Sequence, residues 1–136
     1  MYSLIKNEKG IRWVCNGNYH RKRVLKPAIE SYNGDCLFAV RGIFYKVSKT
    51  EFSIETTYRN LFHSINFSPA VVYLNGTKEW YFRGKLHRDK EPAILYSNGD
   101  CEYFHMGERH RPDGPAVIYG DKQYWFEHGE FVKCIS

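Results

Sequence analysis

The chain of 136 residues lacks the motifs that identify most enzymes. It contains no glycine-rich phosphate-binding loop, no Gly-x-Ser-x-Gly nucleophile elbow and no His-Glu-x-x-His, and its carboxylates are spread singly along the chain. Catalysis usually needs a pocket that holds a nucleophile, or an acid and a base with shifted pKa values. We therefore expect a protein without enzymatic activity and without a cofactor.

Long apolar segments and paired cysteine motifs are also missing. No stretch approaches the roughly 18 apolar residues of a membrane span, and the N-terminal residues form no apolar signal segment. The four cysteines include no Cys-x-x-Cys, and no histidine is grouped with them at ligand spacing. We expect reduced thiols, no metal site, no transmembrane segment, and an intracellular protein that is not secreted.

Aromatic residues are plentiful instead, and they belong to a repeating pattern. They make up 17% of the chain within a hydrophobic fraction of 43%, which is enough for the core of one domain. Residues 84–96 and 107–119 share a glycine, a His-Arg pair and a Pro-Ala step, all offset by 23 residues. Such a period is the signature of a repeat array, which presents an extended surface. The shared landmarks are Gly84, His87, Arg88 and Pro92 in one copy, and Gly107, His110, Arg111 and Pro115 in the other.

Weaker copies of the pattern run through the rest of the chain. The Pro-Ala step occurs four times, and three of these are followed by an Asn-Gly pair at the same distance. We expect a single domain over 1–136, with units near 9–34, 35–76, 77–99 and 100–121 and a partial unit at 122–136. An aromatic residue lies four positions before a glycine at Trp13, Phe38, Trp80, Tyr103 and Trp125.

Each unit carries the signals of two short strands. Residues 78–82 and 93–96 are aromatic or apolar and are bounded by turn residues. Asn-Gly favours a two-residue hairpin turn in which both residues have positive φ. We therefore expect an all-β fold, an elongated antiparallel meander of stacked β-hairpins in which the aromatic landmarks pack over the alanines as a core stripe. The open strands at its two ends favour a homodimer formed edge to edge.

The period is interrupted between Gly42 and Pro69, where the chain takes 27 residues instead of 8. We interpret the extra 19 residues as an insertion near 47–68. An insertion of this kind often carries partner specificity, and the plainer interpretation is a segment that covers an exposed face of the sheet.

Two secondary structures compete for this segment. Apolar residues at helical spacing, with Ser48 and Glu51 placed for a capping box, favour a short helix near 51–65 that packs on the sheet. The alternative is a strand, because apolar or aromatic and polar residues alternate through Phe52, Ile54, Thr56 and Tyr58.

The His-Arg pairs recur at one point of the unit and should form a ladder along one side of the array. We expect each histidine to bond a backbone carbonyl and each arginine to bridge to a carboxylate such as Asp89 or Asp113. These bonds would tie the loop between two strands. The alternative is a ladder of anion-binding positions.

Positive charge is concentrated near the N-terminus. Residues 1–49 contain ten Lys or Arg and three Asp or Glu, a net of +7, whereas residues 50–136 contain ten and twelve, a net of −2. A dense basic cluster suits phosphates of nucleic acid or of anionic lipid, or nuclear import. The plainer interpretation is a solvated loop. The cluster lies in a loop of the first unit and consists of His20, Arg21, Lys22, Arg23 and Lys26.

The unit resembles the MORN repeat family, and specifically the variant in which Gly-x-x-His-Arg is followed by Gly-Pro-Ala, as in residues 107–116. Arginine stands where ordinary MORN units have their second glycine, and their Tyr-x-Gly-x-Trp segment is missing. Proteins similar to this variant occur in large DNA viruses, such as marseillevirus-like viruses, and in phages. The resemblance implies a viral protein in the host cytoplasm or nucleus, or packaged in the virion.

The leading functional hypothesis is a non-enzymatic module for protein-protein interaction or structural scaffolding, which binds through its open face or its insertion. The alternative is a basic accessory protein that binds nucleic acid, or anionic lipid, through the loop of the first unit.

Overall fold

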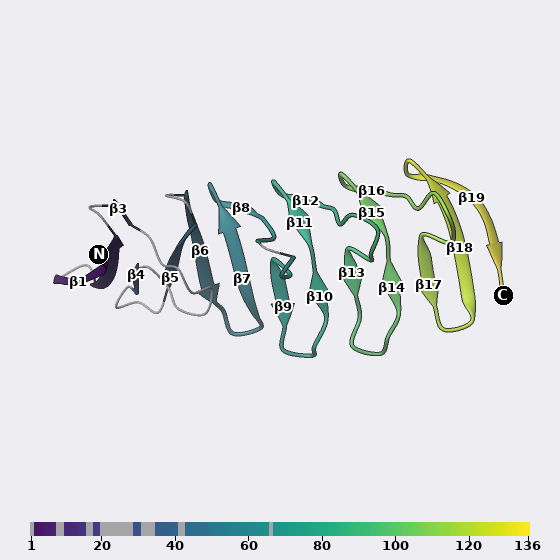
Figure 1. Cartoon of the computed structure of the whole chain (residues 1–136). Helices are drawn as coiled ribbons and strands as arrows, with labels where there is room; N and C mark the ends of the chain where they lie inside the picture. The colour runs from purple at the N-terminus through teal and green to yellow at the C-terminus, as the bar shows by residue number, and fades with distance from the viewer. Residues whose placement is uncertain are drawn as a thin grey trace.

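The computed structural model describes residues 2–7, 10–15, 18–19, 29–30, 35–40, 43–65 and 67–136. Within these residues the fold is all-β, with no helix. Thirteen strands follow one another across a single antiparallel sheet, with two short strands paired beside them, and two further pairs form small sheets. The hairpins stand side by side along one direction, from the N-terminus to the C-terminus (Figure 1). The expected all-β meander of hairpins is confirmed.

Among the described residues, the first part of the chain contributes eight strands. They are β1 (Tyr2–Asn7), β2 (Gly10–Cys15), β3 (Asn18–Tyr19), β4 (Ile29–Glu30), β5 (Cys36–Val40), β6 (Ile43–Lys49), β7 (Ser53–Tyr58) and β8 (Leu61–Phe62).

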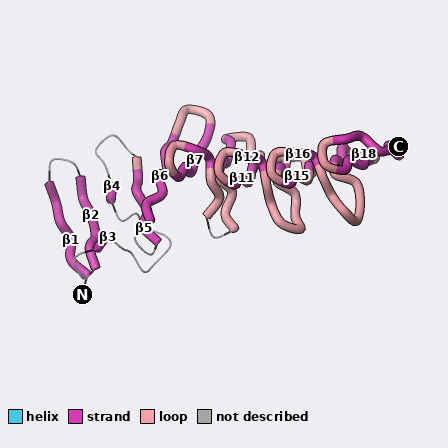
Figure 2. The backbone as a smooth tube through the Cα atoms, turned by 90° about the horizontal axis from the view of Figure 1, so that it is seen from above, coloured by secondary structure: helices cyan, strands magenta, loops and turns pink. Residues whose placement is uncertain are grey.

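The strands of the second part form three successive hairpin units, which Figure 2 shows as loops arranged in a row. They are β9 (Val71–Tyr73), β10 (Lys78–Glu79), β11 (Tyr81–Phe82), β12 (Lys85–Leu86), β13 (Ile94–Leu95), β14 (Cys101–Glu102), β15 (Phe104–His105), β16 (Glu108–Arg109), β17 (Val117–Tyr119), β18 (Lys122–Glu127) and β19 (Glu130–Ile135).

Two kinds of turn join the strands. At the upper turns, at the top of Figure 1, both central residues have positive φ, as at Arg83 (47°) and Gly84 (81°). This is the geometry of the two-residue hairpin turns that favour glycine. Within the described residues these upper turns are Arg59-Asn60, Arg83-Gly84, Met106-Gly107 and His128-Gly129.

The lower turns contain the Asn-Gly pairs, and here the expectation of two positive φ values is wrong. Only the glycine is left-handed, with φ of 92° at Gly76 and 94° at Gly99. The asparagine instead uses its side chain, because Asn98 Oδ1 accepts the backbone N–H of Asp100 at 3.0 Å. A side-chain acceptor two residues before its donor is a common way for asparagine to stabilise a turn.

The helix expected near 51–65 is wrong, and the competing strand pattern is correct. The segment forms β7 and β8, and β7 pairs with β6 on one side and β9 on the other. In place of a helix cap, Thr50 Oγ1 accepts the backbone N–H of Ser53 at 3.0 Å and closes a tight turn. A central strand gains hydrogen bonds on both edges, which outweighs the local helical pattern.

The segment expected to be an insertion carries the landmarks of a repeat unit. Asn60 occupies the upper turn, His63 follows three residues later, and the Pro-Ala step of residues 69–70 precedes β9. The backbone pairing is also the same, since Thr56 N–H donates to Ala70 O at 2.6 Å as Trp80 N–H donates to Ala93 O at 2.8 Å. The strands β7 and β8 of this segment are therefore part of the sheet.

The core lies where the Pro-Ala steps meet the aromatic landmarks. Ala70, Ala93 and Ala116 are fully buried, and Trp80 is buried beside them, with its indole Nε1 donating to Phe67 O at 2.9 Å. Tyr103 and Trp125 are half-buried. The core stripe is thus present in the second part of the chain, while the side chains of Trp13 and Phe38 lie outside the described residues.

Candidate functional site

Three histidines join each unit to the next one. The Nδ1 atoms of His63, His87 and His110 accept backbone N–H groups from the following upper turn, at 3.1, 3.1 and 3.2 Å. The donors are Arg83, Met106 and His128, in the same order. We call these three bonds the histidine staples. The expected ladder is present at His87 and His110, with His63 added, whereas His20 lies outside the described residues. The expected carbonyl partner is wrong, because Nδ1 accepts a hydrogen bond from a backbone N–H.

The staples belong to a continuous column of rings along the upper edge of the array. His87 lies 4.8 Å from His105 between ring centroids, and His110 stacks on His128 at 4.1 Å. Each further neighbour along the column lies between 5.3 and 6.2 Å. The ring column consists of Tyr45, Tyr58, His63, Phe82, His87, His105, His110 and His128.

The arginine of each His-Arg pair covers an aromatic landmark. The Arg88 guanidinium lies 3.8 Å above the Trp80 ring, and that of Arg111 lies 4.0 Å above Tyr103. Each also donates to a proline carbonyl four residues later, at 3.3 and 3.2 Å. These contacts hold the side loop closed, as expected.

Arg88 bridges to a neighbouring carboxylate as expected, but this carboxylate is Glu91, whereas Asp89 pairs with His87. The guanidiniums are committed to these contacts, which argues against the ladder of anion sites.

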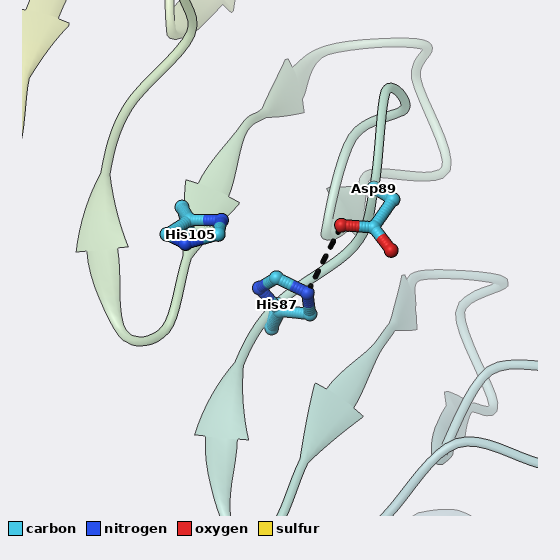
Figure 3. Close-up of side chains that lie close together, drawn as sticks. All are labelled: His87, Asp89 and His105. Atoms are coloured by element: carbon cyan, nitrogen blue, oxygen red, sulfur yellow. Dashed lines mark ion pairs between the residues drawn. The ribbon is translucent and has the colours of Figure 1, made fainter.

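His87, Asp89 and His105 form the one group in the described residues that has the composition of a metal site (Figure 3). One ligand atom of each lies within 4.8 Å of the others, and His87 Nε2 is 3.2 Å from Asp89 Oδ1. However, the N–H of Met106 occupies His87 Nδ1, so the neutral ring carries its proton on Nε2. A ligating histidine normally donates with its second nitrogen, and here that nitrogen accepts. The arrangement fits a His-Asp hydrogen bond and does not fit a metal centre.

A buried carboxylate, Glu102, lies on the face of the sheet that also carries its register partners Ile94 and Val117. Glu102 is 3% exposed and accepts hydrogen bonds from Arg109 Nε and the Tyr96 hydroxyl, both at 2.9 Å, and from the Tyr119 hydroxyl. Burial alone would raise its pKa, but these three donors outweigh burial and hold the pKa of Glu102 below its ordinary value. All donors come from the protein itself, so Glu102 is a structural group.

Glu79 holds the corresponding place in the preceding unit, where it accepts from the hydroxyls of Tyr73 and Tyr81 at 3.3 and 2.9 Å. Burial and the bond to Glu79 raise the pKa of Tyr81 far above its ordinary value. The carboxylate network is therefore repeated along the array, and no signal in the spacing of the carboxylates alone would have revealed it.

The other face of the sheet carries a row of side chains, one from each successive strand, of which five are aliphatic. The exposed members include Ile54 at 46%, Leu95 at 37% and Ile135 at 51%. Residues opposite one another in adjacent strands point to the same face. The successive register partners from β6 to β19 are Lys49, Ile54, Val72, Lys78, Leu95, Cys101, Ile118, Gln123 and Ile135, which we call the aliphatic row.

Two further exposed apolar side chains lie at the lower turns near the start of this row. Phe52 and Leu74 are both mostly exposed, and Leu74 N–H donates to Phe52 O at 2.9 Å. The adjoining turns thus extend the apolar surface of Ile54 and Val72. Sequence reasoning did not identify this surface, although alternation along each strand predicts which residues share a face.

The basic cluster expected to bind anions lies outside the described residues, since His20, Arg21, Lys22, Arg23 and Lys26 fall in the segment 20–28. The landmark residues of the second part are brought together as a structural framework, around the side loops and upper turns. The described part of the chain contains no helix of the length and apolar character needed to cross a membrane.

Comparison of the chain with protein-family models, with curated proteins and with solved structures finds no match.

Proposed function

We propose that this protein is a non-enzymatic repeat scaffold that binds a protein partner along the aliphatic row. The observation that carries the proposal is the exposure of Ile54, Leu95 and Ile135 in one row of register partners, in which Val72 and Ile118 are half-buried and Cys101 is buried. Exposed apolar surface that is contiguous usually marks an interaction site, whereas single apolar residues scattered over a surface do not.

The dimensions of the row support an elongated partner. Adjacent strands lie about 4.8 Å apart, so the eight steps from β6 to β19 span about 38 Å. The charged residues in the row are Lys49 and Lys78, and no carboxylate interrupts it. An apolar segment with acidic neighbours complements this surface, because like charges are excluded and opposite charges steer association.

The cellular setting of this role is proposed from the sequence resemblance. The likeness of residues 107–116 to the MORN variant of large DNA viruses supports a viral scaffold protein that acts inside the host cell or within the virion.

Affinity capture with matched variants tests the proposal. The variant combines Ile54→Lys and Leu95→Lys, and the control is Leu61→Lys, which changes a side chain of similar exposure (49%) at an upper turn. Proteins captured from infected cells by the wild type should be retained by the control and lost from the double variant. Equal capture by the double variant and the control contradicts binding through the row.

A homodimer through the outer edge of β19 is a second candidate, favoured by the exposure of Phe131, Val132 and Ile135. The strand also has a register shift opposite Trp125 and Phe126, and bulges of this kind limit edge pairing. Sedimentation at increasing concentration tests the candidate, and a monomer at every concentration excludes it.

Binding of nucleic acid or anionic lipid by the basic cluster is a third candidate, which rests on the sequence of residues 20–26. Replacing Arg21, Lys22 and Arg23 together should weaken salt-dependent binding to duplex DNA or to anionic vesicles. Unchanged affinity for both probes removes this candidate.

A further inference from the structure

Three backbone amides of the array depend on a neutral imidazole. The staples place the N–H groups of Arg83, Met106 and His128 on the Nδ1 atoms of the preceding units. A ring nitrogen accepts a hydrogen bond only while it carries no proton. Protonation turns both nitrogens into donors, so that the N–H of the next unit then faces another N–H. Each staple therefore breaks when its histidine becomes charged.

Protonation also brings positive charges together. His105 lies between His87 and His110, at 4.8 and 6.2 Å between ring centroids, and His128 lies 4.1 Å from His110. Like charges at such separations repel, and this repulsion acts between successive units. The same event that removes the staples thus adds a force that separates the upper turns.

Charged groups face the rings from several elements. Burial and, to a smaller extent, the charge of Arg83 lower the pKa of His63. Asp89 lies 3.2 Å from His87 Nε2, and Glu108 lies 3.8 Å from His128 Nδ1. The other charged groups near the column are Arg59, Lys85, Glu127 and Glu130.

We propose that the histidine staples make the array sensitive to protons, so that successive units are joined near neutral pH and loosened at their upper turns as the pH falls below about 6. This property is separate from partner binding on the aliphatic row. Within the described residues the staples begin at His63, because Tyr45 holds the corresponding sequence position after Gly42 and has no titrating nitrogen.

The direction of the effect follows from proton linkage. The folded array requires neutral His63, and the unfolded chain binds a proton there more readily because the pKa of His63 is lowered on folding. Stability therefore rises with pH through the ordinary range of histidine, near pH 6.5, and is lost as the pH falls below it.

Amide hydrogen exchange of the full chain, resolved by NMR at about pH 7 and pH 5, tests the proposal. After correction for intrinsic exchange, protection of the Arg83, Met106 and His128 amides should fall by about tenfold at the lower pH, the equivalent of one hydrogen bond. The three amides overturn the proposal if they are equally protected at both pH values.

The same turns contain internal controls. The amides of Gly84, Gly107 and Gly129 donate to the carbonyls of Phe62, Leu86 and Arg109 at 2.8, 2.8 and 2.9 Å, and a carbonyl does not titrate in this range. Their protection should fall less than that of the neighbouring stapled amides. An equal or greater fall at the glycines contradicts a histidine origin.

A substitution separates the staple from general acid sensitivity. His110→Asn keeps an acceptor near the position of Nδ1 but removes the titrating ring, so protection of the His128 amide should no longer depend on pH. His105→Asn is the matched control, since His105 accepts no backbone N–H within the described chain. Continued acid loss of His128 protection in His110→Asn overturns the proposal. If that variant does not fold, His63→Asn and the Arg83 amide provide the same test.

Discussion

Arg109 in β16 donates from Nε to Oε2 of Glu102 in β14 over 2.9 Å, and so joins the strand after an upper turn to a buried position two strands earlier in the chain. The Glu102 side chain is buried, with 3% of its surface exposed, while the Arg109 side chain is 43% exposed. One partner therefore needs the other, because an unpaired carboxylate in this position would lack a counter-charge.

Removal of the arginine tests this dependence. Arg109→Ala should destabilise the protein by about 1–2 kcal/mol, since a hydrogen bond to a charged group is lost and the site is partly screened by solvent. Chemical denaturation measures the change. Arg59→Ala is the control, because Arg59 is exposed at another upper turn and forms no ion pair within the described residues. Equal stability of the two variants would show that Arg109 is not required.

The stabilising effect of Glu102 should depend on pH in the acid range. Its pKa is lowered in the folded protein, so the stability it contributes is present above the ordinary carboxyl range, near pH 4.5, and is lost as the pH falls through that value and below. Urea titrations between about pH 6 and pH 3 should therefore show a smaller acid loss for Glu102→Gln than for the wild type. An identical slope would assign the acid loss to other groups.

The upper turns should discriminate between glycine, asparagine and alanine. Gly84 has φ of 81°, and a Cβ added there would lie 3.3 Å from Leu61 Cδ2. Gly84→Ala should cost about 1–2 kcal/mol, because a left-handed conformation is unfavourable for residues with a Cβ.

The equivalent turn at Asn60, with φ of 63°, provides the reverse experiment. Asn60→Gly should be neutral or stabilising by a few tenths of a kcal/mol, since both residues tolerate this conformation. Thermal unfolding compares the two variants, and destabilisation of equal size in both would contradict the turn assignment.

The alanine of the Pro-Ala step should resist enlargement. Ala93 is fully buried, and its carbonyl accepts the backbone N–H of Trp80 at 2.8 Å. Ala93→Val should destabilise by about 1–3 kcal/mol through overpacking. Ala116→Val, at the same place in the next unit and equally buried, serves to replicate the result. Tolerance of both substitutions would indicate free space beside the landmarks.

Arg88 should shield Trp80. Its guanidinium covers the ring at 3.8 Å, and Arg88→Ala should expose the indole and shift tryptophan fluorescence to longer wavelength, with a stability loss of about 1 kcal/mol. Lys90→Ala, in the same side loop, is the control because Lys90 is exposed and forms no ion pair in the described part. Similar spectra for the two variants would argue that the side loop does not depend on this contact.

The parts of the fold that follow local rules could be predicted from the sequence. The hairpins around Trp80 and Tyr103 are marked by turn residues and by apolar runs of strand length, and both determine local structure directly. Residues 51–65 satisfy a helical and a strand period at once. The pairing of Thr56 with Ala70 decided between them, and that contact is not local in sequence.

The site was harder to predict for related reasons. His63 could have been found, because Asn60, His63 and Pro69 repeat the order of Gly84, His87 and Pro92 once asparagine is accepted in the turn. Whether the imidazole donates or accepts depends on which backbone group faces Nδ1, and this is determined by the next unit. The aliphatic row depends on the register of nine strands, which no single segment specifies.

The order of the strands determines how long the sheet is, because each hairpin is added at the end of the previous one. Every hairpin adds two strand spacings, or about 10 Å, in the same direction. The upper turn at Asn60 follows Gly42 by 18 residues, whereas the later upper turns follow one another after 24, 23 and 22 residues. The hairpin of β6 and β7 nevertheless adds two strands to the sheet, as each later unit does. The length of the sheet therefore depends on the number of hairpins and not on the number of residues.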